Sequence, residues 1–247
     1  MSEAIPHLAG VVDDLTIVKS MYTEQFNHAP AQLLLYTGSP RSGRPSLGGW
    51  VTYGLGTENE DLPGFVVLIS GGVSPFGGKD NWGSGFLPSV YQGTAIGDIK
   101  TPLKNARIGN ITNPRLDNSA QRKQLDLLQS LNRNLANRNP YDTRIDGVIQ
   151  SCELAFRMQA ELPRVMDLSS ETASTHDMYG IGNGRASDNF GRQCLMARRM
   201  IEAGVRHVEV CDEFWDQHKA LKSGHQSRAN ATDQPAAALL ADLEQRG

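Results

Sequence analysis

Three short runs rich in branched aliphatic residues constrain the fold of this chain most. They lie at residues 15–18, 65–69 and 205–211. Runs of this length, bounded by polar residues or glycines, are typical of strands in a sheet. Segments with helical periodicity separate the runs, and strands that alternate with helices favour parallel pairing. We therefore predict an α/β protein in which a mostly parallel sheet is flanked by helices.

Helical periodicity dominates the rest of the chain, where apolar residues recur at every third or fourth position. The expected helices cover residues 4–12, 29–36, 50–56, 117–137, 142–161, 168–179, 188–203 and 232–245. Pro163 is expected to end the helix over 142–161. Asp188 is the expected N-cap of the helix over 188–203, and Gly204 is its expected stop. Thr232 or Asp233 is expected near the N-cap of the last helix.

Residues 71–115 form a Gly- and Pro-rich excursion with little periodicity. Loops of this length in a compact domain are usually functional or disordered, and the aromatic residues of the excursion favour order. The length of 247 residues fits one α/β domain over residues 1–247. No strand pattern precedes the first strand or follows the last helix, so we expect this domain to be truncated at both termini.

The composition excludes several classes of protein. A formal charge of −3 argues against a dedicated nucleic-acid binder. No apolar run approaches the roughly 20 residues of a membrane-spanning helix, and the first residues lack the pattern of a signal peptide. The cysteines, Cys152, Cys194 and Cys211, are far apart. They predict neither a cysteine-based zinc site nor a disulfide scaffold.

A cluster of acidic residues and histidines follows the third predicted strand. Its members are Asp212, Glu213, Asp216, His218 and His225. Carboxylates and imidazoles within one short loop suit a divalent metal ion. The alternative is a solvated acidic loop that contains a bystander histidine.

A second polar cluster lies between the first predicted strand and the following helix. It contains Thr23, Asn27 and His28. A hydroxyl group in such a loop is well placed to act as a nucleophile, because the helix N-terminus favours an anion there. The alternative is helix capping by Thr23 or Asn27, with His28 packed against the helix.

Arg44 offers a third candidate contact in a Gly-Arg-Pro-Ser turn over residues 43–46. Its guanidinium group could bind a pair of phosphate or sulfate oxygens. The alternative is an ordinary surface arginine. The sequence contains no P-loop, Gly-x-Gly-x-x-Gly, Gly-x-Ser-x-Gly or His-Glu-x-x-His motif.

Eleven runs along the chain, Thr-Gly at 37–38 among them, resemble one known family when they are read together. They include Trp-Asp-Gln-His at 215–218 and Asp-Gln-Pro at 233–235, and the others lie at 14–23, 27–31, 43–56, 62–68, 85–88, 91–94, 153–159 and 190–199. In this order they resemble the bacterial family catalogued as domain of unknown function 1501, also labelled sulfatase-like. The resemblance covers nearly the whole chain.

That family resembles the alkaline phosphatase superfamily, which includes arylsulfatases, nucleotide pyrophosphatases and cofactor-independent phosphoglycerate mutases. The resemblance implies an alkaline-phosphatase-like sheet with a divalent metal centre (Zn, Mn or Ca) at its carboxyl edge. It implies a hydrolase of phosphate or sulfate esters whose substrate is a small-molecule or glycan ester. It also implies a periplasmic or other extracytoplasmic location.

The resemblance assigns roles to individual residues. Asp216 and His218 fall where the superfamily places an Asp and a His metal ligand, although the spacing here is Asp-x-His rather than Asp-x-x-x-His, and His225 is the candidate third ligand. Thr23 is similar in position to the superfamily nucleophile. Contacts to the oxyanion would come from the remaining candidates, Asn27, His28 and Arg44. The Cys-x-Pro-Ser-Arg motif of formylglycine sulfatases is absent.

Family members are expected to extend beyond both ends of this chain, with further metal ligands in those extensions. We therefore expect this chain alone to be a weak or inactive catalyst. One alternative is a non-catalytic binding module of the same fold that recognises an anionic glycan or a protein partner. Another is a degraded gene product without a function.

Overall fold

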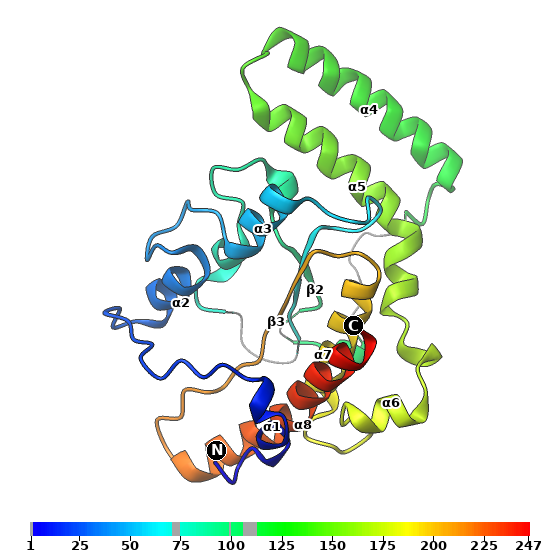
Figure 1. The fold of residues 1–247 in the computed structure, drawn as a ribbon. Coiled ribbons are helices and arrows are strands. Elements are labelled where there is room, and N and C mark those ends of the chain that lie inside the picture. The colour runs from blue at the N-terminus through cyan, green and yellow to red at the C-terminus, as the bar shows by residue number, and fades with distance from the viewer. Residues whose placement is uncertain (1, 71–74, 99, 106–112) are drawn as a thin grey trace.

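A small parallel sheet lies at the centre of the molecule (Figure 1). The structure, a computed structural model, describes residues 2–70, 75–98, 100–105 and 113–247. The central strand β1 (Phe65–Leu68) pairs in parallel with β2 (Thr94–Ile96) on one side and with β3 (His207–Val210) on the other. The predicted parallel sheet flanked by helices is confirmed.

Two of the three predicted strands are present. All four residues of β1 are buried, as expected for a continuous apolar run in the middle of a parallel sheet. The prediction of a strand at 15–18 is wrong: the segment has no regular secondary structure, and Ile17 is 56% exposed. Branched residues favour a strand only where a neighbouring strand offers backbone partners. The short strand β2, inside the excursion over 71–115, was not predicted.

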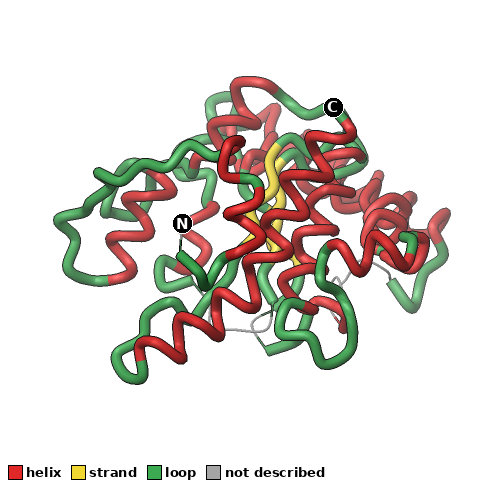
Figure 2. Tube along the Cα trace, turned by 60° about the horizontal axis from the view of Figure 1, so that its bottom comes forward, coloured by secondary structure: helices red, strands yellow, loops and turns green. Residues whose placement is uncertain are grey.

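Helices surround the sheet, as the tube view in Figure 2 shows. Their bounds are α1 Pro6–Gly10, α2 His28–Thr37, α3 Leu47–Leu55, α4 Asn118–Arg138, α5 Thr143–Met166, α6 Ala173–Met178, α7 Asp188–Glu202 and α8 Leu221–Arg246. Short 3₁₀ helices lie at Val12–Asp14, Gly78–Trp82, Ser89–Tyr91, Leu103–Asn105 and Leu168–Ser170. None of the helices within the described ranges is long and apolar enough to cross a membrane.

Most predicted helices are confirmed within a few residues, and the largest differences involve proline. Pro163 does not end α5, which continues to Met166. Pro235 lies inside α8, which begins at Leu221, well before the predicted start at 232. The burial of small residues on both sides of Pro235 keeps α8 packed against the body of the protein. Tertiary packing therefore outweighs the local cost of proline in a helix.

Three predicted helix ends differ in detail. The segment over 168–179 is a 3₁₀ turn followed by the short α6, whose N-cap is Thr172. Asp188 is the first residue of α7 and not its N-cap, which is Ser187; the Asp188 carboxylate accepts the N–H of Gly182 instead. Thr232 and Asp233 lie in the middle of α8 and cap nothing in that helix.

The core lies on both faces of β1, because successive side chains of a strand point to opposite faces. Val66 and Leu68 belong to the larger cluster, which includes Leu162 of α5 and Leu195 of α7. A smaller cluster of buried residues lies on the other face and consists of Phe65, Val67, Ile69 and Trp82. The sheet thus holds the helical layers together through one fully buried strand.

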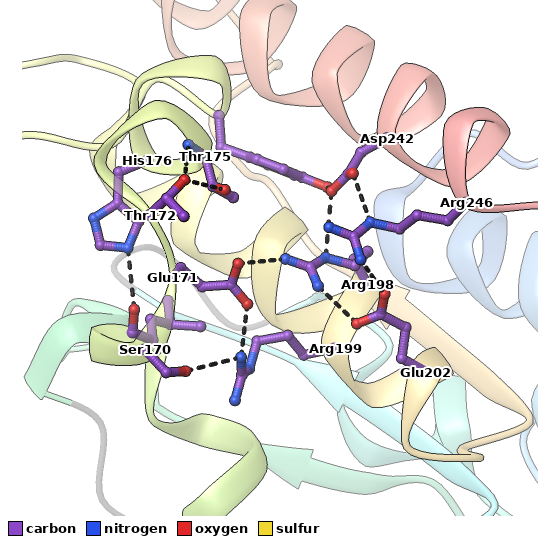
Figure 3. Close-up of polar contacts among 12 residues, drawn as sticks. Ser170, Glu171, Thr172, Thr175, His176, Arg198, Arg199, Glu202, Asp242 and Arg246 are labelled. Carbon is purple, nitrogen blue, oxygen red and sulfur yellow. Dashed lines mark hydrogen bonds and ion pairs between the residues drawn. The ribbon is translucent and has the colours of Figure 1, made fainter.

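A buried ionic network joins α7 to α8 (Figure 3). The side chain of Arg198, on α7, is 4% exposed. Its guanidinium nitrogens lie 2.7 Å from Glu171, 2.6 Å from Glu202 and 3.3 Å from Asp242 of α8. Tyr179 donates its hydroxyl hydrogen to Asp242 at 2.8 Å. The network links α7, α8 and the segment before α6, and three of its charged groups, Arg198, Glu171 and Asp242, have little access to water.

Asp233 attaches the N-terminal helix α1 to α8. Its two carboxylate oxygens accept the backbone N–H groups of His7 and Leu8 at 2.9 and 2.8 Å. These groups lie in the first turn of α1, where N–H groups have no partner inside the helix. Gln234 donates to the carbonyl oxygens of Asp177 and Met178 at the end of α6. The Asp-Gln-Pro run therefore has a structural role in α8.

We expect Asp233→Ala to release α1 from α8. The substitution leaves two N–H groups without their acceptor, and caps of this kind contribute about 1–2 kcal/mol to stability. Amide hydrogen exchange over residues 6–10 should become faster, while exchange in β1 stays unchanged. Asp146→Ala, at an exposed position of α5, is the matched control. Equal exchange at residues 6–10 in Asp233→Ala and wild type would contradict this role.

Candidate functional site

A cavity of about 480 Å³ lies where β3 ends. The chain leaves β3 at Val210, and the loop over 211–216 forms one wall. Helix α2 forms another wall through His28, Gln32 and Tyr36. Ligands of open α/β sheets bind beyond the carboxyl ends of the strands, so this position is typical of a functional site. The two polar clusters predicted from the sequence meet here.

Asp216 joins the two clusters through its carboxylate. Its Oδ2 atom lies 3.1 Å from Nε2 of His28 and 2.8 Å from Nε2 of His218. The His28 ring stacks on Phe76, with 4.5 Å between the ring centroids. The side chains of His28 and Asp216 are about half exposed. A carboxylate between two imidazoles can orient them and hold a proton within reach of solvent.

Asp212 and Glu213 bring further negative charge to the cavity. Burial raises the pKa of Glu213 to about 7, and the charge of Asp212 adds to this shift. Burial also raises the pKa of Asp212, although Trp215 donates an indole N–H to its carboxylate at 2.8 Å. Glu213 Oε2 is buried and has no hydrogen-bond partner among the described residues. Glu213 is therefore partly protonated at neutral pH, the condition that suits a general acid or base.

Backbone strain accompanies these carboxylates. Phe214, directly after Glu213, has a φ of 65°, in the left-handed region that residues with a large side chain rarely adopt. Such a conformation costs on the order of 1–2 kcal/mol and persists only where the surroundings hold it. The guanidinium group of Arg228 lies 5.7 Å from the Phe214 ring centroid and helps to keep that ring in place.

A buried glutamine holds the carboxyl ends of β1 and β3 together. Gln193 of α7 is 1% exposed. In the amide orientation that satisfies both side-chain atoms, its nitrogen donates to the carbonyls of Cys211 and Leu68 at 3.1 and 3.3 Å, and its oxygen accepts from the Ser70 hydroxyl at 2.8 Å. Asn189 donates to the Ser70 carbonyl at 3.2 Å. These contacts fix the start of the loop over 211–216.

Sequence reasoning missed this supporting group. Gln193 was part of the 190–199 run that carries the family resemblance, but no role followed from its pattern. The available signal was a polar residue on the apolar face of a strongly amphipathic helix. Such a residue needs a buried hydrogen-bond partner, but only the tertiary structure decides which group that partner is.

The remaining predicted site residues lie apart from Asp216. Thr23 is exposed, and its hydroxyl oxygen accepts the N–H of Gln25 at 3.1 Å. Asn27 is the N-cap of α2, but its side chain makes no capping hydrogen bond. His225 lies beside the Trp215 ring, 6.3 Å between centroids, and Arg44 is exposed. Of the residues in the two predicted clusters, His28, Asp212, Glu213 and Asp216 line the cavity. Catalytic roles for Thr23, Asn27 and Arg44 stay predictions.

The chemical types of the donor atoms at this site suit the predicted divalent metal, but their positions do not. Carboxylates and imidazoles suit Zn, Mn or Ca, and Glu213 Oε2 is a buried oxygen without a partner. However, no three His, Cys, Asp or Glu side chains in the described part of the chain are gathered as a metal centre requires. Asp216 instead lies beside the imidazole nitrogens of His28 and His218, at 3.1 and 2.8 Å. The described residues therefore do not form the predicted metal centre as they stand.

Comparison with known proteins identifies one match. The model of the family described as protein of unknown function, DUF1501, matches residues 1–247. No curated protein and no solved structure is significantly similar to the chain.

Proposed function

Since this chain belongs to the DUF1501 family, whose function is unknown, we propose that it is a hydrolase of phosphate or sulfate esters that depends on a divalent cation. The reaction site is the cavity at the carboxyl end of β3. One observation carries the proposal: His28 of α2 and Asp216 meet there, in a cavity that also contains Glu213 with its pKa of about 7. A sulfatase-like, alkaline-phosphatase-like fold is part of this proposal.

The proton transfers are assigned to groups of the cavity. Ester hydrolysis needs a proton for the leaving oxygen and a base for the attacking nucleophile. Glu213 can serve either purpose near neutral pH, because both of its protonation states are populated there. Oδ2 of Asp216 lies 3.1 Å from Nε2 of His28, so the carboxylate can hold that ring in the cavity. Thr23 remains the proposed nucleophile, on the basis of the family resemblance.

The charge of the cavity supports the expected cation dependence. Asp212, Glu213 and Asp216 all line it. A phosphate or sulfate ester is an anion, and ionised carboxylates repel it unless a cation offsets their charge. Burial raises the pKa values of Asp212 and Glu213, and a bound cation would favour the ionised form of both carboxylates. Asp216 and His218 are the proposed ligands, with His225 as the third candidate.

Removal and readdition of cations tests this function. Because this chain alone is expected to be a weak catalyst, we expect the chelator-treated chain to release nitrophenol from p-nitrophenyl phosphate or sulfate slowly, and only after Zn²⁺, Mn²⁺ or Ca²⁺ is added. The double variant Asp216→Ala/His218→Ala should lose at least about 100-fold in rate and should bind the cation more weakly by calorimetry. Both variant residues are exposed, so the fold is expected to persist.

The control is Asp146→Ala, which changes an exposed carboxylate on α5, outside the cavity. It should retain wild-type rate and cation affinity. A folded chain that binds none of the three cations and hydrolyses neither ester under any of these conditions contradicts the proposal.

The alternative, a non-catalytic binding module, is favoured by a set of exposed aromatic rings on α3 and the loop beside it. Trp50 is 44% exposed and Phe86 65% exposed, and their ring centroids are 5.7 Å apart. Tyr53 lies 6.0 Å from Trp50. Exposed rings of this kind offer faces for a glycan or a protein partner. Binding of an anionic glycan without turnover, lost in Trp50→Ala and kept in Glu213→Gln, would favour the module over the hydrolase.

A further inference from the structure

Helices α4 and α5 form a long antiparallel hairpin, and Figure 1 shows α4 as its outer helix, with α5 between α4 and the sheet. One side of the hairpin is closed by polar contacts. Arg122 of α4 makes two hydrogen bonds to the carboxylate of Glu153 on α5, at 2.8 and 3.0 Å. Gln129 is buried and donates to the carbonyl of Ile149 at 2.8 Å. These contacts determine which side of α4 faces α5.

A second side of α4 exposes a row of leucines to solvent. Leu127 is 65% exposed, Leu128 46%, Leu131 58% and Leu135 50%. Their spacing of three and four residues places them along one side of the helix. A monomeric soluble protein rarely leaves several large aliphatic side chains together in water, so this row indicates a surface that is covered by another molecule.

Helix α5 extends the apolar row into a face two helices wide. Val148 is 49% exposed on the same hairpin. A shallow cavity of about 530 Å³ between the helices is lined by leucines of α4 and by Cys152, Ala155 and Phe156 of α5. The rest of its lining is glutamine, and no charged side chain contributes. We call this surface the hairpin face.

We propose that the hairpin face binds the hairpin face of a second copy of this chain. Two such hairpins, packed face to face around a twofold axis, form a four-helix bundle, the arrangement in which paired amphipathic helices bury their apolar sides. The uncharged centre favours a second copy, because like surfaces can meet there without burying a charge. Lys123 and Arg138 lie beyond the row and are exposed, so they can remain in water at the rim.

The size of the hairpin face is sufficient for a stable dimer. The 21 residues of α4 span roughly 30 Å, and two packed helices are about 20 Å wide. With its polar rim included, the surface offered by the two helices is about 600 Å² on each copy, and a dimer that used all of it would bury about 1,200 Å² in total, above the ~1,000 Å² of a specific interface. This inference does not depend on the proposed hydrolase function, because the hairpin face lies outside the cavity of β3.

Sedimentation equilibrium of the full chain tests the dimer. At about 100 μM we expect the wild type to have about twice the mass of one 26.9 kDa chain. Leu128→Glu/Leu131→Glu should sediment as a monomer, with a dissociation constant at least about 100-fold higher, because the dimer would bury four new carboxylates. Circular dichroism should remain that of the wild type, since both leucines are exposed in the monomer.

The matched control, Asn137→Glu/Gln150→Glu, adds the same charge at exposed positions of α4 and α5 outside the leucine row. It should remain a dimer. A wild type that is monomeric at about 100 μM overturns the proposal, whether or not another protein covers the face. So does a Leu128→Glu/Leu131→Glu variant that is folded and still dimeric.

Discussion

Replacing Arg198 by Met is expected to lower the free energy of unfolding by about 3–5 kcal/mol at neutral pH. Methionine fills much of the same space but cannot pair with Glu171, Glu202 or Asp242, which approach the guanidinium group. Glu171 and Asp242 would then be buried carboxylates with fewer partners. The free-energy cost of leaving them poorly paired is larger than the net stabilisation that the original ion pairs provide. Urea denaturation followed by circular dichroism measures the change.

Acid should weaken the same network. Burial alone would raise the pKa of Glu171, but hydrogen bonds from Arg199 and Arg198 hold it below its usual value. Burial would likewise raise the pKa of Asp242, but hydrogen bonds from Arg246 and Tyr179 hold it below its usual value. A lowered carboxylate pKa contributes stability that is present above the unfolded-state pKa and is lost as the pH falls through the folded-state pKa. The difference in stability between wild type and Arg198→Met should therefore narrow below about pH 4.

The matched control is Arg164→Met. Arg164 is 69% exposed and pairs with Glu161 on the surface of α5. Exposed pairs contribute less than about 1 kcal/mol, so this variant should unfold close to the wild-type urea concentration. If Arg198→Met were as stable as Arg164→Met, the buried network would not hold α7 and α8 together.

The second large effect is expected from Glu213→Gln, which should reduce ester hydrolysis by about 100- to 1,000-fold and raise stability at pH 8. Burial, with the charge of Asp212, raises the pKa of Glu213 to about 7. A raised carboxylate pKa contributes stability that is complete below the unfolded-state value near 4.5 and is lost as the pH rises through 7. The neutral amide avoids this loss, so Gln should stabilise by about 1–2 kcal/mol at pH 8 and by nearly nothing at pH 4.

Thermal unfolding over this pH range, together with the pH profile of hydrolysis, distinguishes a catalytic carboxylate from a buried carboxylate that has no role in catalysis. Glu60→Gln, at an exposed position outside the cavity, should change neither the thermal stability nor the pH profile of hydrolysis. A stability gain without loss of activity would agree with the raised pKa of Glu213 and remove Glu213 from the proposed mechanism. A Glu213→Gln variant that is less stable than the wild type at pH 8 would contradict the raised pKa of Glu213.

Local sequence patterns were sufficient for the elements that bury one continuous apolar surface. The run at 65–69 predicted β1, and the three- and four-residue spacing over 117–137 predicted α4 to within one residue at each end. The same patterns failed where a partner decides the outcome. Residues 15–18 have the composition of a strand but no regular structure, whereas the unpredicted β2 forms because β1 pairs with it.

The candidate site divides in the same way. The acidic loop after β3 was predicted as a polar cluster, because Asp212, Glu213 and Asp216 follow an apolar strand directly. The contact between His28 and Asp216 joins residues 188 positions apart (216 − 28), and no local pattern encodes it. The raised pKa of Glu213 likewise depends on burial, which is a property of the packed structure.

Sequence alone was thus enough to establish the family, the parallel α/β class and the chemical types of the candidate site residues. Only the tertiary structure decided which of them meet. It placed Asp233 under α1, enclosed Arg198 among carboxylates, and left the leucines of α4 in solvent. The physical reason is that periodicity reports which side of an element avoids water, whereas the identity of the covering group depends on how distant segments pack.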